Sequence, residues 1–330
     1  MRSGYLFAIF LIALILSCNR IFPDEINEKV VFQRFDRELF GIRNNTFPEA
    51  IDSLYEKYSD FLEVFSYHII SIGLPAEKTY RDYLTLFIND PLTREVYTET
   101  QKVFPDMKNE EEIISKAFNR YKYHFPENKI PEIVTFVSGF NNPCFTVGEY
   151  IGIGLDMYLG SSSKFYDRLQ IPQYLKTNMR REKIPSDLIY VWSSDIFPYH
   201  DSVNNLLSHM IHQGQLMYFL EALLPKESDE LLIGFTKEQL RWCNNNEEMM
   251  WIYLIENKLL FSEDQMNIRK IMGPAPFINF FTKESPGKSG IWIGWQIIKE
   301  FAKHNPKLSL KQIMEENDYE KILRLSKYSP

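Results

Sequence analysis

The chain has 330 residues, of which 45% are hydrophobic and 25% are charged, as in an ordinary globular protein. An aromatic content of 15% excludes a largely disordered chain, because enough apolar surface is available to offset the entropy of folding. The net charge of −7 argues against nucleic-acid binding, which requires clustered Lys and Arg. Three cysteines are too few for a disulfide scaffold or a four-cysteine zinc site.

The N-terminus carries a targeting signal. Arg2 is followed by the uncharged run Tyr5–Leu16, which is too short to span a bilayer and matches the hydrophobic region of a secretory signal. The run ends in Ser17-Cys18, which resembles the bacterial lipobox. The resemblance implies cleavage before Cys18 and lipidation of its sulfur, so residues 1–17 are expected to be a lipoprotein signal peptide. An ordinary signal peptide and an uncleaved anchor are the alternatives.

The mature chain is predicted to consist of a short tether and one globular domain. Residues 18–30 are mostly polar and contain Pro23, so they are interpreted as a lipidated tether. Residues 31–330 contain no repeat and no Gly/Ser linker, which indicates a single body. Cys144 and Cys243 could form a disulfide in an oxidising compartment, but the sequence gives no distance between them.

The first part of the body is predicted to be helical. Thr46 and Glu49 match a capping box, and the helix that they open is expected to stop before Gly73 and Pro75. Two further helices are expected at about 77–89 and 110–122. The acidic run Glu110–Glu112 is interpreted as the solvated first turn of the second of them.

A small sheet is predicted in the middle of the chain. Short β-branched runs at 133–137, 144–147 and 150–155 are separated by Gly, Asn and Pro, which favours an antiparallel meander. Residues 161–198 are predicted to form a polar, largely irregular segment with some helix, and residues 202–330 are predicted to be mainly helical. The predicted class is α+β, a helix-rich single body with a small antiparallel sheet.

A helix at about 202–224 carries the only pattern that suggests metal chemistry. His209 and His212 share one face, and Glu247 and Glu248 lie on a later helix. This order of elements resembles gluzincin peptidases, whose motif is H-E-x-x-H. The matching frame here is Ser208-His209-Met210-Ile211-His212, which replaces a zinc ligand by serine and the general base by histidine.

The sequence therefore predicts no catalytic residue, no metal and no cofactor. The preferred interpretation is a polar helix face whose histidines are hydrogen-bonded or solvated. The alternative is an envelope zinc hydrolase with a rearranged site made by His209, His212 and Glu247 or Glu248. A third hypothesis is a small ligand in a cleft between the meander and the central helix. The chain shows neither a G-x-S-x-G nor a dinucleotide-binding motif.

The C-terminal third has unusual placements of aromatic residues, Gly and Pro. They include Asn246-Glu247-Glu248-Met249-Met250-Trp251 and Ser285-Pro286-Gly287-Lys288-Ser289-Gly290-Ile291-Trp292-Ile293-Gly294-Trp295-Gln296-Ile297. Behind a lipobox, this order resembles the GldB family of gliding-motility lipoproteins of Bacteroidota. In that family Ile-Tyr-Tyr-Gly-Lys is usual where this chain has Ile211-His212-Gln213-Gly214-Gln215, so His212 is not expected to be a shared functional residue.

The same block also has a direct physical interpretation. Trp292 and Trp295 lie close to one helix face, and Gly290 and Gly294 allow another helix to approach. Core packing is the preferred hypothesis, and a docking patch for a partner is the alternative. The interaction or structural block is predicted to comprise Trp251, Pro286, Gly287, Trp292, Gly294 and Trp295.

The resemblance implies an envelope lipoprotein that is needed for gliding motility and linked to the type IX secretion machinery, with no established enzyme activity. Together with the incomplete H-E-x-x-H frame, it leads us to expect a non-catalytic protein, a pseudoenzyme. Its expected partners are the membrane, through the N-terminal lipid, and other gliding or secretion proteins, with no nucleic acid. The residues after Cys18 contain no acidic export signal, so we expect a periplasm-facing position.

Overall fold

The computed structural model describes residues 28–42, 47–200 and 203–330. The predicted signal peptide, Cys18 and Thr46 lie outside the described residues. Within those ranges, none of the helices combines the length and apolarity that crossing a membrane would require.

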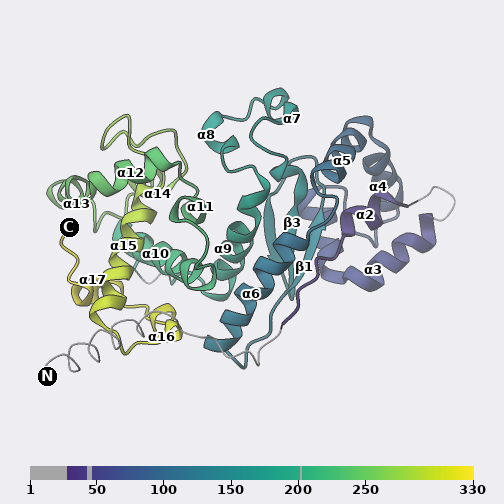
Figure 1. Ribbon diagram of the computed structural model, residues 1–330. Coiled ribbons are helices and arrows are strands. Elements are labelled where there is room, and N and C mark those ends of the chain that lie inside the picture. The colour runs from purple at the N-terminus through teal and green to yellow at the C-terminus, as the bar shows by residue number, and fades with distance from the viewer. Residues whose placement is uncertain (1–27, 43–46, 201–202) are drawn as a thin grey trace, which may run out of the picture.

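The chain forms helices on both sides of a small central sheet (Figure 1). The elements up to the sheet are α2 (Phe35–Phe40), α3 (Phe47–Val64), the π-helix η2 (Phe65–Ile69), α4 (Tyr80–Asn89), α5 (Pro91–Val103), α6 (Lys108–His124), β1 (Glu132–Phe136), β2 (Cys144–Val147) and β3 (Tyr150–Gly154). After the sheet come η3 (Leu155–Tyr158), α7 (Lys164–Arg168), α8 (Gln173–Lys176), η4 (Arg181–Lys183), α9 (Ile184–Ile196), α10 (Leu206–Leu223), α11 (Asp229–Ile233), α12 (Lys237–Asn245), α13 (Glu247–Glu256), α14 (Gln265–Met272), α15 (Ser289–His304), α16 (Leu310–Met314) and α17 (Tyr319–Ser326). The predicted helix-rich body with a small sheet is confirmed.

The sheet is mixed, so the predicted antiparallel meander is wrong. The strand order is β1-β3-β2, with β1 parallel to β3 and β2 antiparallel to β3. Residues 137–143 carry the chain past the end of β3 instead of making a tight turn. Asp156, which follows β3, holds this connection because its Oδ2 accepts the N–H groups of Ser138 and Phe140 at 3.1 and 2.6 Å. Burial raises the pKa of Asp156 to about 6.

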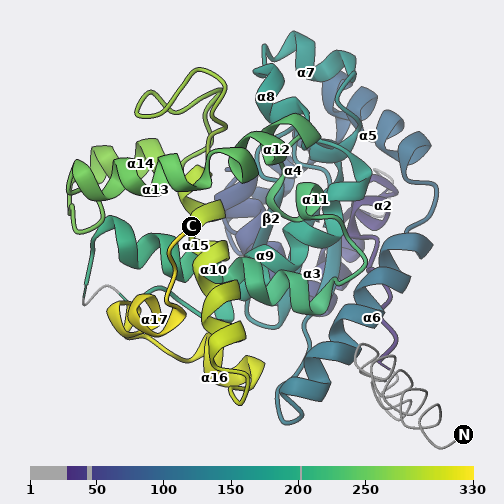
Figure 2. The same cartoon turned by 60° about the vertical axis from the view of Figure 1, so that its left-hand side comes forward.

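The strands are buried on both faces. Ile133, Ile151 and Ile153 belong to the core shared with α6, α9 and α10, whereas Val134 and Phe136 belong to the core under α2 to α4. Alternate residues of a strand point to opposite faces, so the sheet separates two hydrophobic cores. Figure 1 places α2 to α5 on one side of the sheet and the C-terminal helices on the other, and Figure 2 shows α13 to α17 gathered away from α2 and α5.

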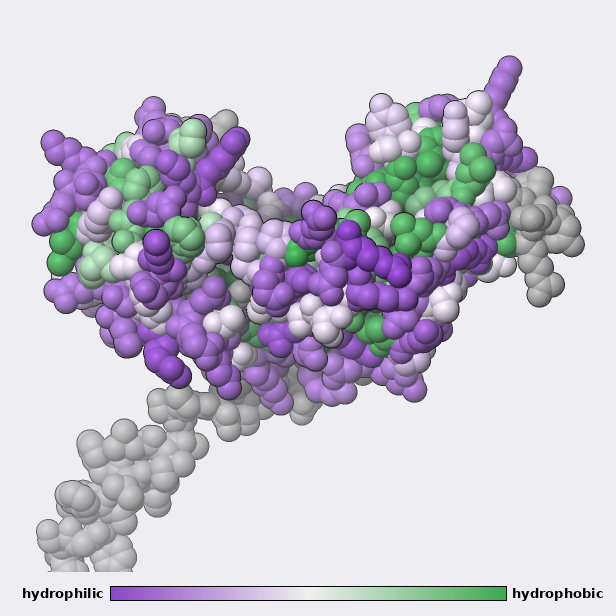
Figure 3. All heavy atoms as spheres, turned by 90° about the horizontal axis from the view of Figure 1, so that it is seen from above, coloured by the Kyte–Doolittle hydropathy of each residue, from purple (hydrophilic) through white to green (hydrophobic). Residues whose placement is uncertain are grey.

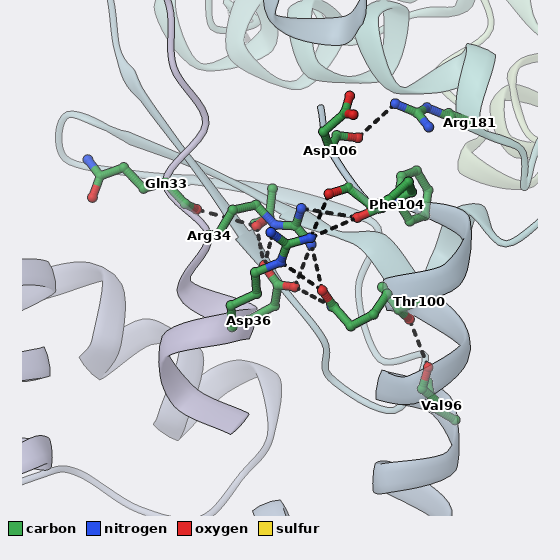
Figure 4. Close-up of polar contacts among 12 residues, drawn as sticks. Gln33, Arg34, Asp36, Val96, Thr100, Phe104, Asp106 and Arg181 are labelled. Carbon is green, nitrogen blue, oxygen red and sulfur yellow. Dashed lines mark hydrogen bonds and ion pairs between the residues drawn. The ribbon is translucent and has the colours of Figure 1, made fainter. Parts of the chain in front are cut away.

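A buried carboxylate ties α2 to its neighbours (Figure 4). The Asp36 side chain is fully buried and accepts a bidentate pair of hydrogen bonds from Arg34, both at 2.9 Å. Gln101 of α5 and Thr135 of β1 donate to the same carboxylate at 2.7 and 2.5 Å. The carboxylate of Asp36 thus fixes α5 against α2 and β1. The sequence did not predict α5, only the helices before and after it.

Replacing Asp36 should be strongly destabilising. Asp36→Ala leaves the guanidinium of Arg34 partly buried without its partner, so we expect a loss of about 3–5 kcal/mol in the free energy of unfolding. Chemical denaturation measures this loss. The control is Glu99→Ala, which removes an exposed pair with Lys102 and should cost less than about 1 kcal/mol. Equal losses in the two variants would contradict a structural function for Asp36.

The predicted solvated turn at 110–112 is wrong for Glu110. Its side chain is only 1% exposed and forms a bidentate ion pair with Arg181 at 2.7 Å. Arg181 lies on η4, far away in the sequence, so a local pattern could not reveal this partner. Cys144 and Cys243 are both buried free thiols, and the optional disulfide is not formed.

The helices α10 and α15 cross with their backbones in contact. A Cβ added to Gly294 would overlap the carbonyl oxygen of Met210, and one added to Gly214 would overlap the carbonyl oxygen of Gly294. Gly290 lies instead against the side chains of Ile271 and Met272 on α14. The predicted close approach at the glycines is therefore confirmed, with α10 as the partner of Gly294.

This crossing predicts a large difference between two similar substitutions. Gly294→Ala should cost at least about 1–3 kcal/mol, because the backbones of both helices must separate to admit the methyl group. Gly290→Ala should cost less, since it displaces side-chain atoms and gains up to about 1 kcal/mol in helix propensity. Thermal or urea unfolding measures both. A Gly294→Ala variant as stable as Gly290→Ala would contradict the crossing.

The molecular surface in the view of Figure 3 is mainly hydrophilic, with apolar side chains gathered towards its two ends. Exposed apolar residues occur on α4 (Tyr83 and Leu86) and on α13 (Met249, Ile252 and Ile255).

Candidate functional site

The two histidines of α10 bind protein atoms. The ring Nε2 of His212 donates to the carbonyl of Phe197 at 3.0 Å, and that of His209 donates to Asn204 Oδ1 at 2.7 Å. The His209 ring also stacks on Tyr199, with the centroids 4.4 Å apart. Burial lowers the pKa of both histidines. Each Nε2 is thus engaged in a hydrogen bond within the protein.

The two glutamates of α13 point to different surroundings. Glu247 accepts a hydrogen bond from the hydroxyl of Tyr328 at 2.7 Å, and Glu248 is exposed. Within residues 28–42, 47–200 and 203–330, no group of three or more His, Cys, Asp or Glu side chains is arranged to hold a metal ion. The rearranged zinc site is not assembled from these side chains.

The aromatic–glycine block lies in the core. Trp292 and Trp295 are 1% and 0% exposed, and Trp251 is buried edge-on against Tyr328. Trp295 keeps its indole N–H satisfied by donating to Glu221 at 2.8 Å, and Lys299 lies 3.9 Å above its ring. Pro286, Gly287 and Gly294 are buried as well. These positions agree with core packing and leave none of the six residues on an open docking surface.

A pocket of about 230 Å³ opens where this block begins, and we call it the Lys288 pocket. Four separate stretches of chain form it, around α8, the start of α9, the α11–α12 turn and the loop before α15. Its lining residues are Tyr174, Leu175, Asn178, Lys183, Asp187, Gly234, Phe235, Gln239, Pro274, Ala275, Gly287 and Lys288. Gly287 is required at its edge, because an added Cβ would overlap the backbone of Ala275.

The charged groups of the pocket differ in the number of hydrogen bonds that they form. Lys183 donates to Asp187 Oδ1 at 2.7 Å, to Ser186 Oγ at 2.8 Å and to the carbonyl of Leu232 at 3.4 Å. Asp187 Oδ2 accepts from Tyr158 at 3.0 Å. Burial lowers the pKa of Lys288, the charge of Lys183 lowers it further, and Asp187 opposes both effects. The positive charges of Lys183 and Lys288 allow the arrangement to bind an anion.

Only part of this site had a signal in the sequence. Lys288 lies in the block singled out above, and Lys183 and Asp187 have the i,i+4 spacing of a helical ion pair. Their convergence depends on how α9 packs against the loop before α15, which no local pattern encodes. A second cavity, of about 300 Å³, lies beside His212 and is lined also by His200, Gln215 and Lys311.

Comparison with protein families now identifies the chain. The family model described as gliding motility protein GldB matches residues 20–330. The chain belongs to the GldB family. This membership confirms the resemblance noted in the sequence and makes the protein a gliding-motility lipoprotein by family. Neither the curated proteins nor the solved structures include a match to the chain.

The buried His212 predicts a pH-dependent stability. Because its folded pKa lies below 6.5, the unfolded chain takes up the proton first, and stability is lost as the pH falls from about 6.5 through the folded pKa. The charges of His200 and His209 act in the same direction. His212→Gln should keep a hydrogen-bond donor and reduce the loss of stability between about pH 7.5 and pH 5.5.

Urea unfolding at the two pH values measures this effect. The control variant is His68→Gln, which makes the same substitution at an exposed side chain. If His212→Gln lost as much stability on acidification as the parent protein, the assigned burial of His212 would be wrong.

Proposed function

We propose that this GldB-family protein is a lipid-anchored, non-catalytic component of the cell envelope. It supports gliding motility and the type IX secretion machinery through contacts with other envelope proteins. The observation that carries the proposal is the family match over residues 20–330. The lipobox at Cys18 supplies the anchor, residues 1–17 are removed, and the body faces the periplasm.

The path of the chain at residues 28–32 supports this arrangement. The backbone N–H groups of Glu28, Val30 and Phe32 donate to Asn119, Ser115 and Glu111 on α6. The chain therefore leaves the body along α6. Residues 19–27 then connect the body to lipidated Cys18, and a fully extended segment of this length reaches about 30 Å. The lipid would thus hold the body close to the bilayer surface.

The surroundings of the histidines and glutamates support a non-catalytic function. A catalytic zinc needs three protein ligands and an open coordination position. Here His209, His212 and Glu247 each bond to a protein group, and Glu248 lies on the surface. No similarity to a zinc peptidase accompanies the family match, so the alternative of a zinc hydrolase gains no support.

A complementation experiment tests the function. In a gliding bacterium that carries this gene, deletion should abolish spreading on agar and reduce secretion of type IX cargo, and the parent gene should restore both. A His209→Gln, His212→Gln double variant should restore both as well, because glutamine keeps a hydrogen-bond donor at each position. Cys18→Ala should fail to restore them and should release the protein from the membrane fraction.

Protein levels and metal content provide the controls. Immunoblots establish that each variant accumulates, and elemental analysis of protein purified without chelators should find no stoichiometric zinc. A deletion strain that glides and secretes normally would contradict the proposed function. An accumulated double-glutamine variant without activity, together with one bound zinc per chain, would favour the hydrolase.

A further inference from the structure

The Lys288 pocket contains two ammonium groups with different partners. Lys183 is 6% exposed, and its three donors are directed to Asp187, Ser186 and Leu232. Asp187 in turn has both oxygens occupied, by Lys183 and by Tyr158. This pair is therefore internally neutral and complete.

The ammonium of Lys288 is in a different situation from that of Lys183. Within the part of the chain that the structure describes, its ammonium forms neither a hydrogen bond nor an ion pair, although the side chain is partly buried at the pocket wall. The ammonium keeps some contact with water, so an anion that enters the pocket can reach it. The pocket thus carries one uncompensated positive charge.

The backbone directs Lys288 into this position. Its φ of 62° lies in the left-handed region, which glycine or asparagine usually occupies at such a turn. A hydrogen bond of 2.9 Å from its N–H to the carbonyl of Gly273 holds the turn, and Gly287 packs against Ala275. The backbone of Lys288 is consequently held by a hydrogen-bonded turn at the pocket wall.

We propose that the Lys288 pocket binds a monoanionic carboxylate, paired with the ammonium of Lys288. One uncompensated charge matches one negative charge, whereas the carboxylate of Asp187 disfavours a dianion such as a phosphate monoester. Tyr174, Leu175, Phe235 and Pro274 provide apolar walls for the body of the ligand. A volume of about 230 Å³ accommodates a short chain or one ring.

The carboxylate has two sources with the same chemistry, a small free acid or the C-terminus of a polypeptide. The experiment uses the full-length lipidated protein in detergent and four probes. These are benzoate, a short peptide ending in phenylalanine, the same peptide with an amidated C-terminus, and inorganic phosphate. The rate at which each lysine is acylated by an amine-reactive reagent is followed by peptide mass spectrometry.

Lys258 is the internal reference, because it is an exposed lysine in the same left-handed conformation, with φ of 55°. At about ten times its Kd, a bound probe should slow acylation of Lys288 about tenfold and leave Lys258 unchanged, since only the unliganded fraction reacts. Protection by benzoate alone would indicate a small acid, and stronger protection by the free-acid peptide would indicate a C-terminus. The amidated peptide and phosphate should not protect.

Two variants separate binding from folding. Lys288→Gln should abolish the increase in thermal midpoint that the protective probe gives to the parent protein, while its own midpoint stays within a few degrees. Lys258→Gln should retain the increase. The proposal is overturned if neither acid protects Lys288, if the amidated peptide or phosphate protects equally, or if Lys288→Gln still responds. Failure here leaves the gliding function untouched, because complementation does not depend on the pocket.

Discussion

The structure depends on the contact between the backbones of α10 and α15. Gly214 and Gly294 bring the two helices so close that a single methyl group on either would overlap a carbonyl oxygen. Most residues of α10 are buried and none of them is fully exposed, so several of its polar residues are buried together with its apolar ones. Ser208, His212 and Gln215 are at most 7% exposed. The polar face expected on this helix is therefore interior at Ser208 and His212 and partly exposed at His209 and Gln213.

Their burial explains why these polar groups of α10 serve the fold. Gln215 donates to the carbonyls of Ile313 and Glu316 at 2.7 and 2.9 Å and so fixes α16. His212 donates to Phe197 and fixes the end of α9. A buried polar group without a partner is costly, so each of these side chains has one. The histidine pattern that resembles a zinc motif in the sequence is, in the fold, a set of structural hydrogen bonds.

The sequence predicted elements better than their arrangement. Runs of β-branched residues located all three strands of the described sheet, because each run is short and bounded by Gly or Pro. The order of the strands was not predicted, and the connection between β1 and β2 is held by Asp156, a side chain outside that connection. Glu110 was misplaced for the same reason, since its partner Arg181 lies on another element. Periodicity is local, whereas these two interactions are not.

In the candidate site, too, local features were predictable and contacts between distant residues were not. The aromatic–glycine block was recognised as unusual, and its packing function follows from the spacing of Trp292, Gly294 and Trp295. The Lys288 pocket could not be predicted, because residues from the distant stretches 174–187, 234–239 and 274–288 meet there. Lys288 differs from the exposed surface lysines through its partial burial. It also lies beside Lys183 and Asp187, which use their hydrogen-bonding groups on each other and on neighbouring residues. Such a difference exists only in the folded chain.

Amide hydrogen exchange of the full-length protein tests the central claim, that the α10–α15 crossing holds the molecule together. The account predicts that the amides around Gly214 and Gly294 exchange last, at a common rate set by global unfolding, and after those of α4 and α13. Exchange at the crossing that precedes exchange in these peripheral helices would contradict it.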